Sequence, residues 1–201
     1  MTYSEQFCNK FRSAFDLCRG SFQSEREWAD VWRFKWNNFM LWNPPEPQKK
    51  AVLEATAGGM ELKYWDREPL RLDAAFTELA STSIGNLPVP LVVGLEHEND
   101  IRSFNHEIYK LAYVRCRLKV GITYASMRKP TTSAEELAEC QNQIVTWAKG
   151  CFETINRYTI EDERTEYLYL LGTEEPTLTL NWYAFSFTAK SGLDSRDWHT
   201  I

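Results

Sequence analysis

The sequence lacks the features that mark membrane, secreted and zinc-stabilised proteins. No stretch approaches the roughly 18 consecutive apolar residues of a membrane-spanning helix. The N-terminal segment carries charges throughout and no apolar core, so we expect no secretory signal and a cytoplasmic location. The only three histidines, His97, His106 and His199, do not have the spacing of zinc ligands.

Cysteine is also scarce, and several catalytic motifs are missing. The five cysteines are odd in number and contain no CxxC pair, which argues against a disulfide framework and favours reduced, packed thiols. The chain has no GxSxG, no Walker A loop and no GxGxxG. These absences argue against a serine hydrolase and against a nucleotide cofactor.

The composition is that of a globular protein. The chain has 201 residues, of which 43% are hydrophobic, and this length fits a single domain over 1–201. The net charge of −5 argues weakly against nucleic-acid binding. One basic run softens that argument, because residues 112–130 contain no acid and five bases: Arg115, Arg117, Lys119, Arg128 and Lys129. The run is either a patch for a polyanion or a solvated strand end and loop.

Hydrophobic periodicity predicts a mixed chain of helices and strands. Three helices are expected first, over 4–19, 24–41 and 46–57, the last closed by Gly58-Gly59. In the next part of the chain, the pattern predicts strands over 60–68, 70–79 and 89–98, a helix over 99–116 and a strand over 118–126. A helix opened by Thr132-Ser133 and strands over 165–173 and 178–188 are expected to follow. The short connections of the first three strands favour antiparallel pairing.

This order predicts an α/β fold with a central mixed sheet flanked by helices. Residues 1–57 form an N-terminal helical extension, residues 60–124 a sheet core, and residues 131–201 a C-terminal helix with two strands. The tryptophan-rich stretch 27–42 is predicted to be mainly core, with DNA stacking and a dimer interface as the alternatives.

Acidic residues gather at the end of a buried strand, in LVVGLEHEND (91–100). Because residues two apart on a strand share a face, Glu96 and Glu98 project together and His97 points away as a packed or capping histidine. If 70–79 pairs with 89–98, Asp73 lies beside the two glutamates. Such a cluster needs a shared proton or a cation, and Mg²⁺ (or Mn²⁺) prefers oxygen ligands. The alternative is the solvated end of an edge strand.

These acids and the element order resemble the PD-(D/E)xK nuclease superfamily. Its α-β-β-β-α-β core can be laid on residues 46–124, with Asp73 of RLDAAF at the first acidic position and Glu96 at the second. Glu98 stands at the position where most members have lysine. BamHI-like enzymes resemble this chain there, because they have Glu-x-Glu. Lys110 in the following helix is a candidate for a relocated lysine, or else an ordinary surface partner of Glu107. No proline precedes Asp73, which departs from the common pattern.

The resemblance implies a restriction-endonuclease-like core and a magnesium-dependent endonuclease acting on DNA. It implies that Asp73 and Glu96 bind the metal, with Glu54 as a helical third ligand. Glu98 would orient or deprotonate the attacking water, and Lys110 would balance charge on the phosphate. Nucleases of this class that cut both strands often dimerise, so a homodimer is one expected partner state, and no membrane partner is expected.

Two other functions remain open from the sequence. The first is a catalytically inactive protein of the same fold that acts as a binding or assembly subunit, which the negative charge and the missing third-position lysine favour. The second is an unrelated α/β interaction protein whose acids are a solvated strand end. Fold resemblance alone does not decide among these, because one fold serves many functions.

Overall fold

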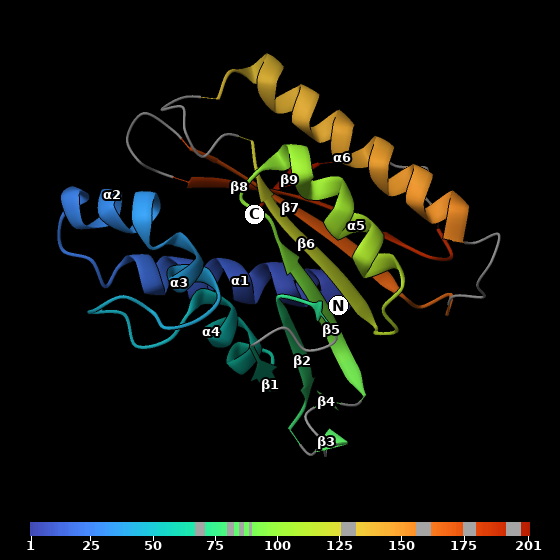
Figure 1. The fold of residues 1–201 in the computed structure, drawn as a ribbon, viewed down its shortest axis with the longest axis horizontal. Helices are drawn as coiled ribbons and strands as arrows, with labels where there is room; N and C mark the ends of the chain where they lie inside the picture. The colour runs from blue at the N-terminus through green and yellow to red at the C-terminus, as the bar shows by residue number, and fades with distance from the viewer. Residues whose placement is uncertain are drawn as a thin grey trace. The chain divides into compact units, whose positions relative to one another are not determined.

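In the computed structural model, the described residues are 1–66, 71–79, 83–84, 87–88, 90–125, 132–155, 162–174, 180–191 and 198–201. The fold is mixed α/β, as predicted, and the chain divides into two compact units, Met1–Leu91 and Val92–Ile201 (Figure 1). A restriction-endonuclease-like core and a single domain stay predictions.

The first unit begins with four helices: α1 (Tyr3–Arg19), α2 (Glu25–Phe34), α3 (Trp36–Met40) and α4 (Val52–Gly59). Helix α1 starts where predicted because Thr2 and Glu5 form a reciprocal capping box. Its apolar residues at helical spacing, Phe7, Phe11, Phe15 and Cys18, are all buried. Periodicity therefore located this helix correctly.

The expectation of one helix over 24–41 is wrong, because the backbone leaves the helical region at Lys35 (φ −130°, ψ 19°). The ring centroids of Trp28 and Trp36 are 6.0 Å apart, whereas residues eight apart in a straight helix rise by about 12 Å. The break lets these rings and Phe39 pack into one aromatic cluster. The prediction of core for this stretch is confirmed for Trp28, Trp32 and Trp36, which are buried.

The predicted helix over 46–57 starts later and ends later than expected. Residues before Val52 form turns in which the Gln48 side chain donates to the carbonyls of Phe39 and Lys50, at 3.2 and 2.5 Å. Gly58 and Gly59 do not close the helix but form its last turn. Gly59 packs against α1, where an added Cβ would lie 3.2 Å from Cδ of Lys10.

The strands of the first unit are β1 (Leu62–Trp65), β2 (Ala74–Glu78), and a short pair of β3 (Ser83–Ile84) with β4 (Leu87–Pro88). β1 and β2 pair antiparallel, as predicted for neighbouring strands. Asp73 was expected inside a strand but lies in the bend just before β2. The strand starts late because Arg71, with φ 66°, turns the chain before it.

The second unit contains a mixed sheet with two helices. In order along the sheet, its strands are β5 (Leu91–His97), β6 (Leu118–Tyr124), β7 (Glu166–Glu174), β8 (Leu180–Thr188) and β9 (His199–Thr200); the first residue of β5 is the last of the first unit. β5, β6 and β7 are parallel neighbours, and β7, β8 and β9 are antiparallel. The sequence analysis found all of these except the two-residue β9.

The helices of this unit are η2 (Ile101–Ser103), α5 (Phe104–Ala112) and α6 (Ala134–Ile155). The predicted helix over 99–116 is therefore shorter, with a 3-10 turn at its start. α6 begins where predicted, because Ser133 and Glu136 cap each other reciprocally.

Helices α5 and α6 cover one face of this sheet (Figure 1). Their buried residues, among them Phe104, Ile108 and Ile144, form one core cluster with Tyr169 and Phe185 of the strands. Gly121 of β6 lies under this layer, where an added Cβ would be 2.7 Å from Cζ of Phe104. The absence of a side chain at Gly121 thus lets α5 approach the sheet closely.

The structure also describes the cysteines and part of the basic run 112–130. All five cysteines lie in the described ranges and none forms a disulfide, as predicted. Burial raises the pKa of Cys8 to about 12 and that of Cys18 to about 11.

Lys119 does not belong to a surface patch, because it is 1% exposed and its Nζ lies 3.0 Å from the carbonyl oxygen of Ala112. Arg128 and Lys129 lie outside the described residues.

Within the described part of the chain, no helix combines the length and apolar character needed to cross a membrane.

We predict that Gly121→Ala lowers the free energy of unfolding by about 1–3 kcal/mol, because the new methyl group overpacks Phe104 and Tyr169. Gly150→Ala in α6 is the matched control, since an added Cβ there meets nothing within 4 Å, and we expect it to stabilise by about 0.4–1 kcal/mol. Urea unfolding of both variants measures the difference. Equal stabilities would contradict the close approach of α5 to β6.

Candidate functional site

The candidate site in the second unit is built around a buried carboxylate, Glu96 of β5. The side chain of Glu96 is 0% exposed. In the sheet, Glu96 lies opposite Gly121 of the parallel neighbouring strand β6. A buried carboxylate is costly unless it is compensated. Compensation comes from Lys110 of α5, whose Nζ lies 2.9 Å from Oε1 of Glu96.

Lys110 connects this buried group to the surface. Its Nζ also lies 2.6 Å from Oε2 of Glu107, one turn earlier on α5, and its side chain is 43% exposed. Partial burial alone would lower the pKa of Lys110, but the hydrogen bonds to Glu107 and Glu96 outweigh it and raise the pKa. Lys110 therefore stays charged. Its ammonium contacts the buried carboxylate of Glu96, and its side chain is partly exposed to solvent. The predicted pair with Glu107 exists, and Lys110 also contacts Glu96.

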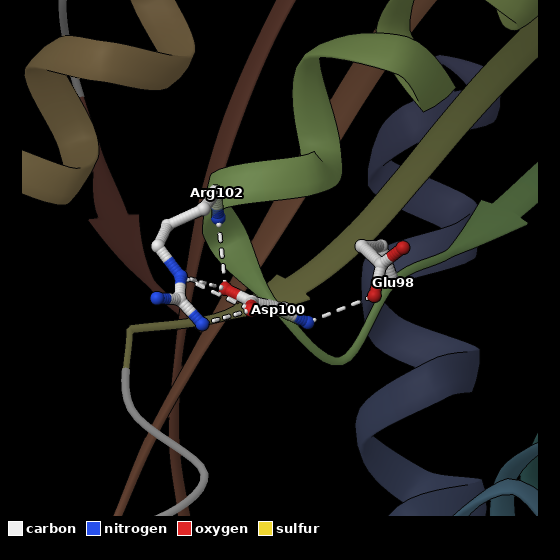
Figure 2. A network of polar contacts seen from close by, with 3 residues as sticks. All are labelled: Glu98, Asp100 and Arg102. Atoms are coloured by element: carbon white, nitrogen blue, oxygen red, sulfur yellow. Dashed lines mark hydrogen bonds and ion pairs between the residues drawn. The ribbon is translucent and has the colours of Figure 1, made fainter.

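Glu98 lies just past the end of β5, where a turn fixes it (Figure 2). Its Oε1 accepts a hydrogen bond of 2.9 Å from the backbone N–H of Asp100. Asp100 in turn accepts from the backbone N–H of Arg102 at 3.0 Å and pairs with the Arg102 guanidinium. Asp100 is therefore the N-cap that starts the η2–α5 segment, and Figure 2 shows how it ties the strand end to that segment.

His97 is a packed residue, as the strand parity predicted. Its Nε2 lies 2.8 Å from the hydroxyl oxygen of Tyr124 on β6. Tyr124 is two residues beyond Ile122, the partner of His97 in the sheet, so both side chains are on the face opposite Glu96. Burial lowers the pKa of His97 to about 3, which keeps the imidazole neutral.

The first unit holds the other two predicted ligands, Glu54 and Asp73. Glu54 lies on α4 with its side chain 40% exposed, and its Oε1 is 3.9 Å from Nζ of Lys50. Both carboxylates act on the hydroxyl of Tyr64, which donates to the carbonyl of Leu41 at 2.6 Å. The pKa of Tyr64 is raised, first by burial and then by the negative charges of Asp66, Glu54 and Asp73. The structure thus brings Glu54 and Asp73 near one tyrosine.

A magnesium ion makes limited demands on the protein. Among the described residues, no three His, Cys, Asp or Glu side chains gather as a metal-binding group. Mg²⁺ commonly uses one or two carboxylates and keeps several waters, so a three-residue cage is not required. Glu96 offers such an ion a buried carboxylate, of which Oε1 is paired with the Lys110 ammonium at 2.9 Å.

Comparison of the chain with protein-family models and with curated proteins finds no match. The likeness to the PD-(D/E)xK nucleases therefore rests on the residues and the element order given above and stays a prediction.

The sequence analysis missed two polar groups near these residues. Tyr64 was treated only as part of an alternating strand, although its hydroxyl is the group that Glu54 and Asp73 both influence. Thr123 of β6 is a fully buried hydroxyl-bearing residue among apolar neighbours. A lone threonine in the strand LKVGITY was the available signal, but threonine is common in strands and did not stand out.

We predict that His97 makes the protein less stable in acid. Its pKa is about 3 in the folded state and near 6.5 when unfolded, so between these values the unfolded chain binds the extra proton. The free energy of unfolding should therefore fall as the pH drops from 6.5 toward 3, by up to about 1.4 kcal/mol per pH unit from this group. Urea unfolding of the wild type and His97→Gln across this range measures it. The exposed His106→Gln is the control, and an unchanged pH slope in His97→Gln would contradict the assignment.

We predict that Lys110→Met lowers the free energy of unfolding by about 1–3 kcal/mol, because the buried Glu96 carboxylate loses its ammonium partner. The double variant Glu96→Gln/Lys110→Met should recover part of this loss, since it removes the buried charge as well. Lys149→Met, whose partner Glu153 is 3.9 Å away and 55% exposed, should change stability by less than about 0.5 kcal/mol. A double-mutant cycle without coupling would show that Lys110 does not compensate Glu96.

Proposed function

We propose that this protein is a magnesium-dependent endonuclease that hydrolyses phosphodiester bonds in DNA. The observation that carries the proposal is the pair of Glu96 and Lys110, at 2.9 Å, near the carboxyl end of a parallel strand. Phosphodiester hydrolysis needs a carboxylate to hold a cation and a positive group to face the phosphate charge. Lys110 supports the second need because it is positively charged and its side chain is 43% exposed.

The proposal gives each residue a role. Glu96 would hold Mg²⁺, which would supply Lewis acidity to the phosphate oxygen, and the ligand roles of Asp73 and Glu54 rest on the resemblance alone. Glu98 accepts a proton from the attacking water, whose oxygen bonds to phosphorus as the bond to the leaving sugar oxygen breaks. Lys110 offsets the negative charge that builds up on the phosphate. The leaving oxygen takes its proton from solvent.

The second candidate is a catalytically inactive protein of the same fold that binds a partner. It is favoured by the double engagement of Lys110, whose ammonium contacts both Glu96 and Glu107. In this alternative, Lys110 serves only to neutralise buried charge. An unrelated α/β interaction protein has no specific observation in its favour beyond the solvated turn at Glu98.

We predict that the wild type nicks supercoiled plasmid DNA or cuts single-stranded circular DNA with Mg²⁺ or Mn²⁺, and that EDTA stops it. Glu96→Gln should lose at least about 100-fold in rate, because it removes a charged ligand of the cation, and Asp73→Asn tests the ligand role that the resemblance implies for Asp73. Glu78→Gln at the exposed end of β2 is the matched control and should keep full rate. Thermal unfolding of every variant excludes loss of fold as the cause.

The outcomes separate the candidates. A wild type that cuts neither DNA in either metal favours the inactive binding protein. Full cleavage by Asp73→Asn would remove that residue from the proposed site while leaving Glu96 in place.

A further inference from the structure

Thr123 of β6 is a buried hydroxyl that the fold does not explain. It is 0% exposed, and among the described residues its Oγ1 has no hydrogen-bond partner. An unpartnered buried hydroxyl costs free energy, and valine would fill the same volume on a strand without that cost. Such a group calls for a polar partner that the described part of the chain does not supply.

The strand register assigns Thr123 to the face of Glu96. Glu96 pairs with Gly121, and Thr123 follows Gly121 by two residues, so both lie on the same side of β6. An added Cβ on Gly121 would be 2.7 Å from Cζ of Phe104 on α5, and α5 also carries the partner of Glu96, Lys110. Thr123 is therefore on the α5-covered face, near the carboxyl ends of the parallel strands.

Glu98 is the residue opposite Thr123 in this register. The sheet ladder continues beyond β5, because the backbone N–H of Glu98 donates to the carbonyl of Ile122 at 2.9 Å. One oxygen of Glu98 is held by the backbone of Asp100, which fixes the carboxylate in its turn (Figure 2). Among the described residues, the hydrogen bond that the Glu98 carboxylate accepts from Asp100 uses Oε1, so Oε2 is the oxygen that we assign to a bound molecule.

We propose that Thr123 is a positioning residue whose hydroxyl, together with the Glu98 carboxylate, holds one water molecule at the carboxyl ends of β5 and β6. This inference rests on the proposed nuclease function, in which that water is the one added to phosphorus. The hydroxyl donates to the water or accepts from it, and it exchanges no atom or electron with the substrate. Its effect is to keep the water in line for attack.

The test compares three variants in the full chain. Thr123→Val removes the hydroxyl at nearly constant volume, and Thr123→Ser keeps it. Thr77→Val is the matched control, because Thr77 is also 0% exposed on a strand but its Oγ1 accepts from the indole N–H of Trp65 at 3.0 Å. Each is measured for metal-free thermal unfolding, Mn²⁺ affinity by calorimetry, and kcat and KM on supercoiled plasmid DNA.

Thr123→Val should keep the melting temperature of the wild type but lose about 10- to 100-fold in kcat at unchanged KM, with Mn²⁺ affinity weakened by up to about 10-fold. Thr123→Ser should restore kcat, which a purely structural role would not require. Thr77→Val should lower the melting temperature and keep kcat, because it leaves the Trp65 indole unpartnered.

Two outcomes overturn the inference alone: a Thr123→Val variant with wild-type kcat, or one that loses thermal stability as Thr77→Val does. A wild type that neither binds Mn²⁺ nor cleaves DNA overturns the proposed function and the inference together.

Discussion

The charge of Glu96, buried at 0% exposure and compensated by Lys110 at 2.9 Å, is the constraint on which the second unit depends. Removing a carboxylate from water is tolerated only where a cation or several donors replace the water. Helix α5 must therefore present Lys110 to β5, and this requires a close approach of the helix to the sheet. Gly121 permits that approach, because any side chain there would collide with Phe104 of the same helix. One electrostatic contact and one missing side chain thus fix α5 over the ends of the parallel strands.

This arrangement concentrates polar groups at the carboxyl ends of β5 and β6. Glu96, Glu98 and Thr123 belong to the side of the strands that α5 covers, whereas His97 and Tyr124 form a separate buried hydrogen bond on the other side. The two sides differ in charge. His97 is held neutral by burial, while Lys110 and Glu96 are held charged by each other. The proposed function uses the charged side, whereas His97 and Tyr124 pack on the neutral side.

The first unit contributes in a different way. Its aromatic cluster around Trp28, Trp36 and Phe39 gives the N-terminal helices a core of their own. Near β1, Tyr64 is surrounded by negative charge from Asp66, Glu54 and Asp73, and burial together with these charges raises its pKa. The tyrosine hydroxyl is thus kept protonated and serves as a donor to Leu41.

The sequence by itself determined the helices and strands whose signals are local. The start of α6 follows from its capping residues, whereas the buried face of α1, the alternation in β7 and β8, and the opposite orientations of Glu96 and His97 follow from periods of 3.6 and 2 residues. Tertiary structure decided the rest, because it depends on contacts between distant residues. The break at Lys35 serves the packing of Trp28 on Trp36, the burial of Lys119 follows from its bond to Ala112, and the partner of Glu96 comes from the following helix. The burial of a charged side chain and the identity of its ion-pair partner depend on residues that are distant in the sequence. Only the folded chain therefore shows which acidic side chains are exposed to solvent and which are buried and paired.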